Sequence, residues 1–161
     1  MREEDCIALL RRAGCSEGVI AHCRAVRDLA LAYASDPLVD RDLVETGAFL
    51  HDIGRGVTHD LRHAEAGGDI CRASGLDEAV ATIVERHIGA GLTADECSLL
   101  GLIPRDCMPR TLEEKIVAHA DNLVKGTRTI ALEERLQHAI ALPKKQRKRI
   151  RRLMQEMELF R

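Results

Sequence analysis

Aromatic residues are almost absent from this chain of 161 residues, which has no Trp, one Tyr and two Phe. Its core must therefore be built from Leu, Ile, Val and Ala, and this favours helices over sheets. The scarcity also argues against binding of single-stranded nucleic acid by base stacking, which requires aromatic platforms. The length fits one domain, and the shares of apolar (45%) and charged (31%) residues are those of an ordinary globular protein.

Three other signals are missing from the sequence. No CxxC pair occurs among the six cysteines, which argues against a zinc knuckle. The first residues, MREEDC, are charged and lack the apolar run of a signal peptide. No stretch approaches the roughly 18 apolar residues of a membrane span. We therefore expect a cytoplasmic protein without a membrane segment, whose cysteines are reduced and act as small hydrophobic residues.

Apolar residues recur at helical spacing throughout the chain, and strand alternation is not seen. The pattern predicts helices over 3–13, 17–34, 41–53, 62–74, 77–88, 94–100 and 112–125, with one or two more after Gly126 and a break near Pro143. Loops are expected at 54–60 and 104–110, an N-cap at Ser16, and a capping box formed by Thr111 and Glu114. The sequence thus predicts a single all-α domain, a compact bundle of roughly six to eight helices.

The C-terminal segment carries a concentration of positive charge. Residues 144–161 hold eight Lys/Arg and two Glu, and KKQRKRIRR occupies 144–152, although the whole chain has a formal net charge of −2. Such a cluster could attract phosphates or RNA. The favoured interpretation is the solvated face of a terminal helix.

Four histidines fall on the apolar faces of four different predicted helices: His22, His51, His63 and His87. A single histidine on such a face is more often a satisfied core residue than a ligand. Four unpaired imidazoles, however, would be costly to bury. If the four apolar stripes meet in one core, a metal site accounts for all of them at once.

Two carboxylates complete the pattern. Asp52 follows His51 at a helix end, and Asp121 lies at the border of the apolar face of 112–125. His119 is about 160° round the helix from Asp121 and is not expected to share its site, and His138 lies in a charged segment that does not suggest a ligand. Imidazole and carboxylate together suit divalent iron, manganese, zinc or nickel, and the absence of thiolate pairs weakens the case for structural zinc.

These residues resemble the HD superfamily of metal-dependent phosphohydrolases. The similarity rests on VIAHCRAVRDLA around the first histidine, GAFLHDIGR at the His-Asp doublet and AHADNL at the last aspartate. The intervening RHAEAGGDI and VERHIGAGLT are similar to the binuclear HDIG subset, which includes small stand-alone HDIG proteins and the YqeK-type diadenosine tetraphosphate hydrolases. The resemblance implies one HD domain over 1–161, with a metal-site core at about 19–124 and a basic helical extension at about 127–161.

The resemblance also implies a ligand set. One ion would be held by His22, His51, Asp52 and Asp121, and a second by Asp52, His63 and His87, with Asp52 as the bridge. Two departures from related cyclic-di-nucleotide phosphodiesterases make those substrates less expected: Arg55 replaces the Lys of HDIGK, and no GYP motif occurs. Iron or manganese would be the favoured ions, with nickel, zinc and magnesium compatible.

The implied activity is that of a phosphohydrolase, either a phosphomonoesterase or a phosphodiesterase, acting on a nucleotide or a related phosphoester through metal-activated water. Asp52 and Arg55 are the candidate catalytic residues, and Arg55, Arg62 and His59 the candidate substrate contacts. Arg55 is equally well explained as a cation at a helix C-terminus, and His59 is more simply an exposed loop residue. The alternatives are a non-catalytic nucleotide- or RNA-binding HD module, and a helical adaptor with a purely structural metal. Oligomeric state cannot be inferred from the sequence.

Overall fold

A computed structural model describes residues 1–161 as a helical bundle with a single short hairpin. Its nine α-helices are α1 (Glu3–Arg12), α2 (Glu17–Tyr33), α3 (Arg41–Leu50), α4 (His63–Ala73), α5 (Glu78–Arg86), α6 (Ala94–Leu99), α7 (Leu112–Asn122), α8 (Leu132–His138) and α9 (Lys144–Met157). Three 3-10 helices are added: η1 (Ile53–Gly56), η2 (Ala139–Ala141) and η3 (Glu158–Phe160). The prediction of an all-α fold is confirmed, with a helix count just above the expected range.

The hairpin was not predicted. Strand β1 (Val124–Lys125) pairs antiparallel with β2 (Arg128–Thr129), and Gly126 takes a positive φ of 62° in the turn between them. Glycine adopts this conformation at no steric cost. Strands of two residues are too short to show an alternating pattern, so no sign of them is seen in the sequence.

The helices begin largely where side chains can cap them. Ser16 accepts a hydrogen bond from the amide of Val19, as expected of an N-cap. At the start of α7 only half of the expected capping box forms: Thr111 accepts from the amide of Glu114, but the Glu114 carboxylate turns to the amide of Arg110 instead. The reciprocal box occurs at the start of α6. Acceptor side chains thus cap five of the nine α-helices, whereas α1, α4, α8 and α9 begin without a side-chain cap.

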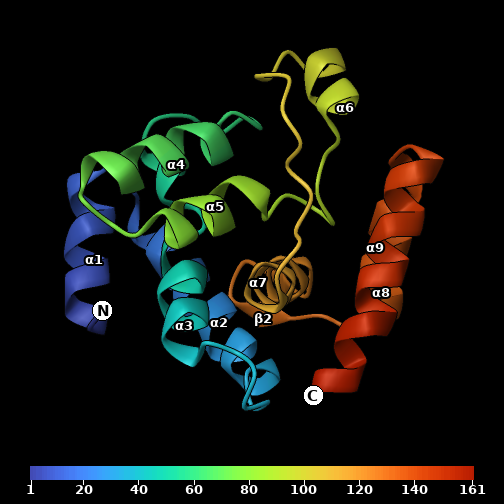
Figure 1. Ribbon diagram of the computed structural model, residues 1–161, viewed down its shortest axis with the longest axis horizontal. Coiled ribbons are helices and arrows are strands. Elements are labelled where there is room, and N and C mark those ends of the chain that lie inside the picture. The colour runs from blue at the N-terminus through green and yellow to red at the C-terminus, as the bar shows by residue number, and fades with distance from the viewer.

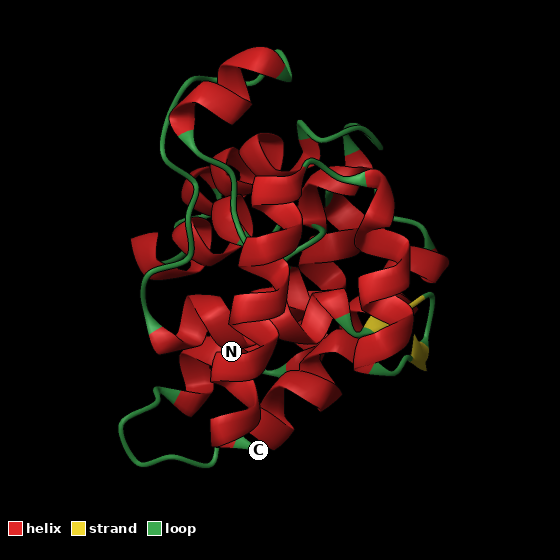
Figure 2. Ribbon diagram, turned by 90° about the vertical axis from the view of Figure 1, so that its right-hand side faces the viewer, coloured by secondary structure: helices red, strands yellow, loops and turns green.

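Helix α7 lies at the centre of the molecule (Figure 1). Helices α3, α4 and α5 lie on one side of it and α8 and α9 on the other, while α6 projects with its flanking loops. Figure 2 shows how little of the molecule is strand. Segments from both ends of the chain therefore pack around one central helix.

The core is mostly aliphatic, as the composition predicted. One hydrophobic cluster is built around residues such as Val26, Ile116 and Met157, and a second around residues such as Leu10 and Val84. Two of the three aromatic residues are nevertheless fully buried, at Tyr33 and Phe49. All six cysteines are free, and five of them are buried, consistent with a role as small apolar residues.

Two glycines allow helices to approach closely beside the His-Asp doublet. A Cβ at Gly54 would lie 1.8 Å from the carbonyl oxygen of His63, and one at Gly47 would lie 2.7 Å from Cδ1 of Ile83. Gly47 therefore makes room for the side chain of Ile83 in α5. Gly54 also does not end a helix running to residue 53, since α3 ends at Leu50 and the expected loop opens with η1.

The basic segment forms α9, which begins directly after Pro143, where the break was predicted. The inner face of α9 buries Ile150, Leu153, Met154 and Met157. Most of its Lys and Arg side chains are exposed. This is the terminal helix with a solvated basic face that the sequence favoured. None of the helices is both long enough and apolar enough to cross a membrane.

Candidate metal centre

Six side chains from five separate segments of the sequence meet beside α7. His22 lies within α2 and Asp121 near the end of α7. The others stand at helix ends: His51 directly after α3, Asp52 directly before η1 and His63 at the start of α4. The sixth, at the end of α5, is His87. Every residue predicted as a metal ligand is therefore brought into one cluster.

Asp52 lies in the middle of the cluster, and its two oxygens face opposite ways. Oδ1 lies 3.1 Å from Nε2 of His63 and 3.5 Å from Nε2 of His87. Oδ2 lies 3.8 Å from Nε2 of His51 and 3.9 Å from Nε2 of His22. This is the placement that a bridging carboxylate requires.

The cluster has two halves with different exposure. In the outer half, Asp121 Oδ1 lies 3.1 Å from Nε2 of His22 and 3.4 Å from Nε2 of His51. The inner half consists of His63 and His87, whose side chains are only 4% and 2% exposed. The side chains of His22 and Asp121 are 17% and 24% exposed, so the outer half is the side open to solvent.

All four histidines are held in the same way. Each Nδ1 lies within hydrogen-bond distance of a backbone carbonyl oxygen: Gly126 for His22 (2.7 Å), Ala48 for His51 (2.8 Å), Asp60 for His63 (2.7 Å) and Val84 for His87 (2.6 Å). A carbonyl oxygen can only accept, so Nδ1 donates and carries the proton. In the neutral ring the Nε2 lone pair then faces the carboxylates, as in metal-ligating histidines.

The contacts at the centre are unfavourable without a cation. Nε2 of His63 lies 3.1 Å from Nε2 of His87, so two lone pairs face one another. Nε2 of His51 and Oδ1 of Asp52 are buried and make no hydrogen bond. Buried polar atoms of this kind are rarely left without a partner. Divalent metal ions would satisfy all of them, so the residues fit such ions.

Two overlapping groups of three have ligand atoms close enough to hold an ion: His22 with His51 and Asp121, and His51 with Asp52 and His87. The identity of the metal and the number of ions remain predictions.

Both carboxylates are ionised. Burial alone would raise the pKa of Asp52, but the charge of His51 and the contacts with His63 and His87 hold that pKa well below its usual range. Burial would likewise raise the pKa of Asp121, but the charge of His51 and the contact with His22 outweigh it, and the pKa is lowered. In turn the carboxylates outweigh the burial of His51 and raise its pKa. The centre thus favours positive charge, which a metal ion supplies by displacing a proton.

The predicted substrate contacts lie differently from the ligands. Nε of Arg55 donates to Asp52 Oδ2 at 2.9 Å and Nη1 donates to the carbonyl oxygen of His59 at 3.0 Å, so Arg55 is tied to the centre and does not extend freely from a loop. His59 itself is exposed. Arg62 pairs with the Asp60 carboxylate at 2.5 Å. Contacts of these three residues with a substrate remain a prediction.

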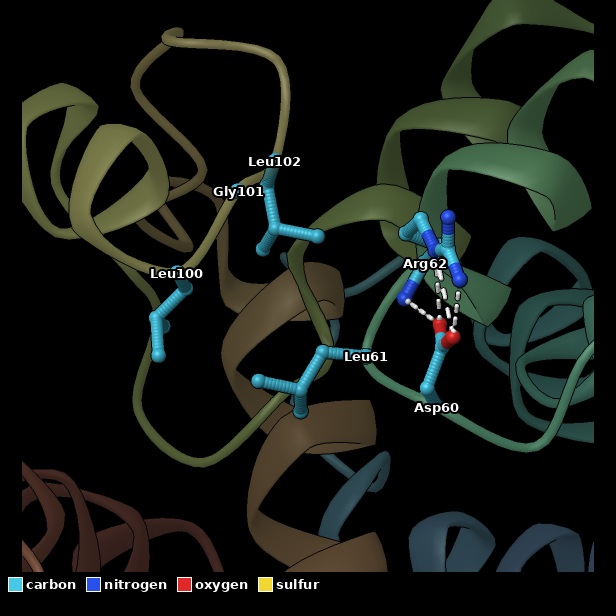
Figure 3. A pocket seen from close by; sticks show the side chains of 6 residues that line it. All are labelled: Asp60, Leu61, Arg62, Leu100, Gly101 and Leu102. Carbon is cyan, nitrogen blue, oxygen red and sulfur yellow. Dashed lines mark hydrogen bonds and ion pairs between the residues drawn. The ribbon is translucent and has the colours of Figure 1, made fainter.

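Arg62 lies at a hollow of about 370 Å³ whose lining includes none of the six predicted ligands. Figure 3 shows its guanidinium directed at Asp60, with Leu61, Leu100 and Leu102 across the hollow.

A second hollow, of about 270 Å³, opens at Asp121 and contains functional candidates that the sequence reasoning missed. Its lining includes Lys125, Arg135 and His138, from the hairpin and α8. These positions follow the last motif, and no spacing in the sequence connects them with it. His119, by contrast, does not join the ligand cluster: it is fully buried beside Tyr33, in agreement with the helical spacing.

The sequence is similar to those of several known proteins. An uncharacterised protein of Methanocaldococcus jannaschii is 48% identical over 139 residues, which cover 83% of this chain and 82% of that protein. The tRNA (cytidine(56)-2′-O)-methyltransferase of Thermoplasma volcanium is 46% identical over 132 residues, which cover 82% of this chain but only 39% of the methyltransferase.

The fold is also similar to that of a solved structure. This structure is the HD domain of the L. monocytogenes phosphodiesterase PgpH in complex with cyclic-di-AMP. It superposes with a TM-score of 0.60 at 18% sequence identity, and the match covers 91% of this chain and 93% of the PgpH chain. A family model described as the HD domain matches residues 19–126, which include all six residues of the cluster. The chain therefore belongs to the HD domain family.

Proposed function

We propose that the protein is a metal-dependent phosphohydrolase that cleaves a phosphoester of a nucleotide or a related compound. The observation that carries this proposal is the convergence of four histidine Nε2 atoms on two ionised carboxylates, with Asp52 between the two halves. Membership of the HD domain family supports it. Support for a nucleotide comes from the PgpH domain, whose structure contains cyclic-di-AMP.

The ligand assignment follows the two halves of the cluster. One ion is assigned to His22, His51, Asp52 and Asp121, and a second to Asp52, His63 and His87. Divalent ions bound there would lower the pKa of a water molecule and offset negative charge on the phosphoryl oxygens. Iron and manganese are the favoured ions, and nickel, zinc and magnesium are also compatible with imidazole and carboxylate ligands.

The chain's own residues hold this chemistry in place. Backbone carbonyls fix the four imidazoles through Nδ1, so that each ring presents Nε2. The bond from Arg55 Nε fixes the Asp52 carboxylate. Nη2 of Arg55 makes no hydrogen bond, so both of its N–H groups are available to a phosphoryl oxygen. His59 and Arg62 are proposed as outer substrate contacts.

A second candidate function is binding of a nucleotide or RNA without turnover. Two observations favour it: a related segment occupies 39% of a tRNA methyltransferase, and α9 exposes basic residues that include Lys144, Lys148 and Arg151. A binding module does not need six convergent metal ligands, and for this reason hydrolysis is the preferred proposal.

Metal analysis and turnover assays test the proposal together. The protein is loaded with manganese or iron and assayed against nitrophenyl phosphoesters, nucleotides, dinucleoside polyphosphates and cyclic nucleotides. We expect hydrolysis that is lost in Asp52→Ala and kept in Asp69→Ala, whose carboxylate is 79% exposed. Equal activity of Asp52→Ala and the unmodified protein would sink the proposal. RNA or nucleotide binding with no hydrolysis under any ion would establish the binding module instead.

A further inference from the structure

The hollow at Asp121 adjoins the outer half of the metal centre. Asp121 belongs to both, since its Oδ1 faces His22 and His51 while the residue lines the hollow. The hairpin and α8 form much of the remaining wall. A group that occupies this hollow therefore lies directly beside the predicted metal ligands.

Arg135 stands out among the cations of the hollow. Its side chain is only partly exposed, and no carboxylate oxygen lies within 4.0 Å of it, in contrast to its neighbour Arg128, which pairs with Glu134 at 2.9 Å. Its one hydrogen bond runs from Nε to Oδ1 of Asn122, at 2.8 Å. A partly buried guanidinium without an anionic partner is costly, and both of its terminal amino groups remain available to an anion.

Asn122 fixes this arrangement. Its Nδ2 donates to the carbonyl oxygens of Gly89 at 2.6 Å and Ala118 at 2.8 Å. With the amide held in this orientation, Oδ1 is presented to Arg135, and the guanidinium is held at the wall of the hollow that Asp121 also lines, without an ion pair between the two. The cation is therefore pre-positioned rather than free to turn into solvent.

Two further basic residues line the same hollow. Lys125 is exposed in β1 and has no carboxylate within 4.0 Å, and His138 is exposed at the end of α8. Unpaired cations gathered around a hollow of about 270 Å³ would bind a compact anion well.

We propose that this hollow is the phosphate subsite of the enzyme, in which Arg135, assisted by Lys125, holds the substrate's phosphate group against the metal centre. The inference rests on the proposed function and extends it. It makes the hairpin and α8, which lie beyond the last ligand in the sequence, part of the substrate-binding site. In this role Arg135 binds the substrate's phosphate group and is not a metal ligand.

The test combines a binding measurement with kinetics on the metal-loaded protein. Inorganic phosphate is titrated calorimetrically into the unmodified protein, Arg135→Gln and Lys125→Gln, with Lys148→Gln as a control that removes an exposed cation of α9. We expect phosphate affinity to fall about tenfold in Arg135→Gln, less in Lys125→Gln and not at all in Lys148→Gln. Helix α8 has no fully buried residue and should tolerate the change, and exposed Lys125 offers a second, independent variant.

The kinetic arm follows bis(p-nitrophenyl) phosphate. We expect Arg135→Gln to raise KM about tenfold, with kcat within about threefold and unchanged metal content. Phosphate affinity and KM equal to those of the unmodified protein in both pocket variants would overturn the inference while leaving the hydrolase assignment intact. Phosphate binding that depends on Arg135 without hydrolysis of any substrate would instead overturn the proposed function and leave the subsite standing.

Discussion

Two groups of polar residues in this protein each contain a fully buried histidine and differ in chemistry. One is the ligand cluster, represented by His51. The other is the Tyr33 cluster, which consists of Tyr33, His119 and Glu158 and lies where α2 and α7 meet the C-terminal end of the chain. His51 and His119 are both 0% exposed, so burial does not distinguish them.

The hydrogen bonds of the two rings do distinguish them. Nδ1 of His51 is fixed by a backbone carbonyl, and Nε2 faces two carboxylates. Neither ring nitrogen of His119 has a hydrogen bond, and its ring packs edge-on to Tyr33 with 4.8 Å between centroids. Burial lowers the pKa of His119 to about 4, so the ring is neutral. A fixed tautomer and convergence with other candidate ligands, rather than burial, therefore distinguish His51, a predicted metal ligand, from His119.

The largest effect is expected from a substitution at the centre of the ligand cluster. Asp52→Ala removes the carboxylate shared by both halves, so we expect loss of bound metal and a fall in phosphoester turnover of more than about 100-fold, beyond what loss of a supporting hydrogen bond causes. His119→Leu, the matching change in the Tyr33 cluster, should retain metal and activity. Metal content is measured by mass spectrometry of the dialysed protein, and a His119→Leu variant that lost its metal would contradict the distinction.

A smaller change separates the two halves of the cluster. His87→Ala removes a ligand of the inner half only, so metal stoichiometry should fall from two ions to one, and turnover should fall with it. His138→Ala, in the hollow outside the ligand set, should leave the stoichiometry unchanged. Titration with manganese, followed by paramagnetic resonance, counts the ions. A stoichiometry of one in the unmodified protein would refute the binuclear assignment.

Close packing distinguishes the ligand cluster in a further way. Gly54→Ala would place a Cβ 1.8 Å from the carbonyl oxygen of His63, forcing α4 away from η1. We expect a loss of stability of about 1–3 kcal/mol, as for other overpacked sites, together with weaker metal binding. Urea denaturation measures the first effect. Gly18→Ala, whose nearest neighbour would be Oγ of Ser16 at 3.7 Å, should be neutral or stabilising.

The smallest effect concerns the Tyr33 cluster alone. Burial, and then Glu158, raises the pKa of Tyr33 from 10.0 to about 12, and the hydroxyl donates to the carboxylate at 3.0 Å. Because the pKa in the folded state is the higher one, this stabilisation is present below pH 10 and is lost as the pH rises towards 12.

Tyr33→Phe should therefore be less stable than the unmodified protein by about 1 kcal/mol at pH 8, and the gap should close as the pH rises above 10. Urea midpoints of both proteins at several pH values test this, with metal content as the control. A gap that stayed constant up to pH 11 would show that the hydroxyl does not titrate as described.

The sequence placed the six side chains of the cluster on interior faces because its signals are local, and their role as metal ligands stays a prediction. Each histidine was assigned to the interior from the apolar residues one turn away, and His119 was excluded by the same spacing. The close approaches at Gly47 and Gly54 were not predicted, because the atoms that these glycines accommodate belong to other helices, α5 and α4, whose packing no local pattern shows. Only half of the capping box at Thr111 forms for a similar reason, since the Glu114 carboxylate, besides accepting from the amide of Arg110, pairs with Arg86 of α5, 28 residues away.

The sequence by itself determined the helices, the kinds of ligand and their placement on interior faces, because helical periodicity and side-chain chemistry act over a few residues. Only the tertiary structure decided which nitrogen each histidine presents, which way each oxygen of Asp52 faces, and that Arg135 lines the same hollow as Asp121. These features depend on contacts between distant segments. His22, for example, takes its orientation from the carbonyl of Gly126, 104 residues away, and no local pattern encodes such an approach.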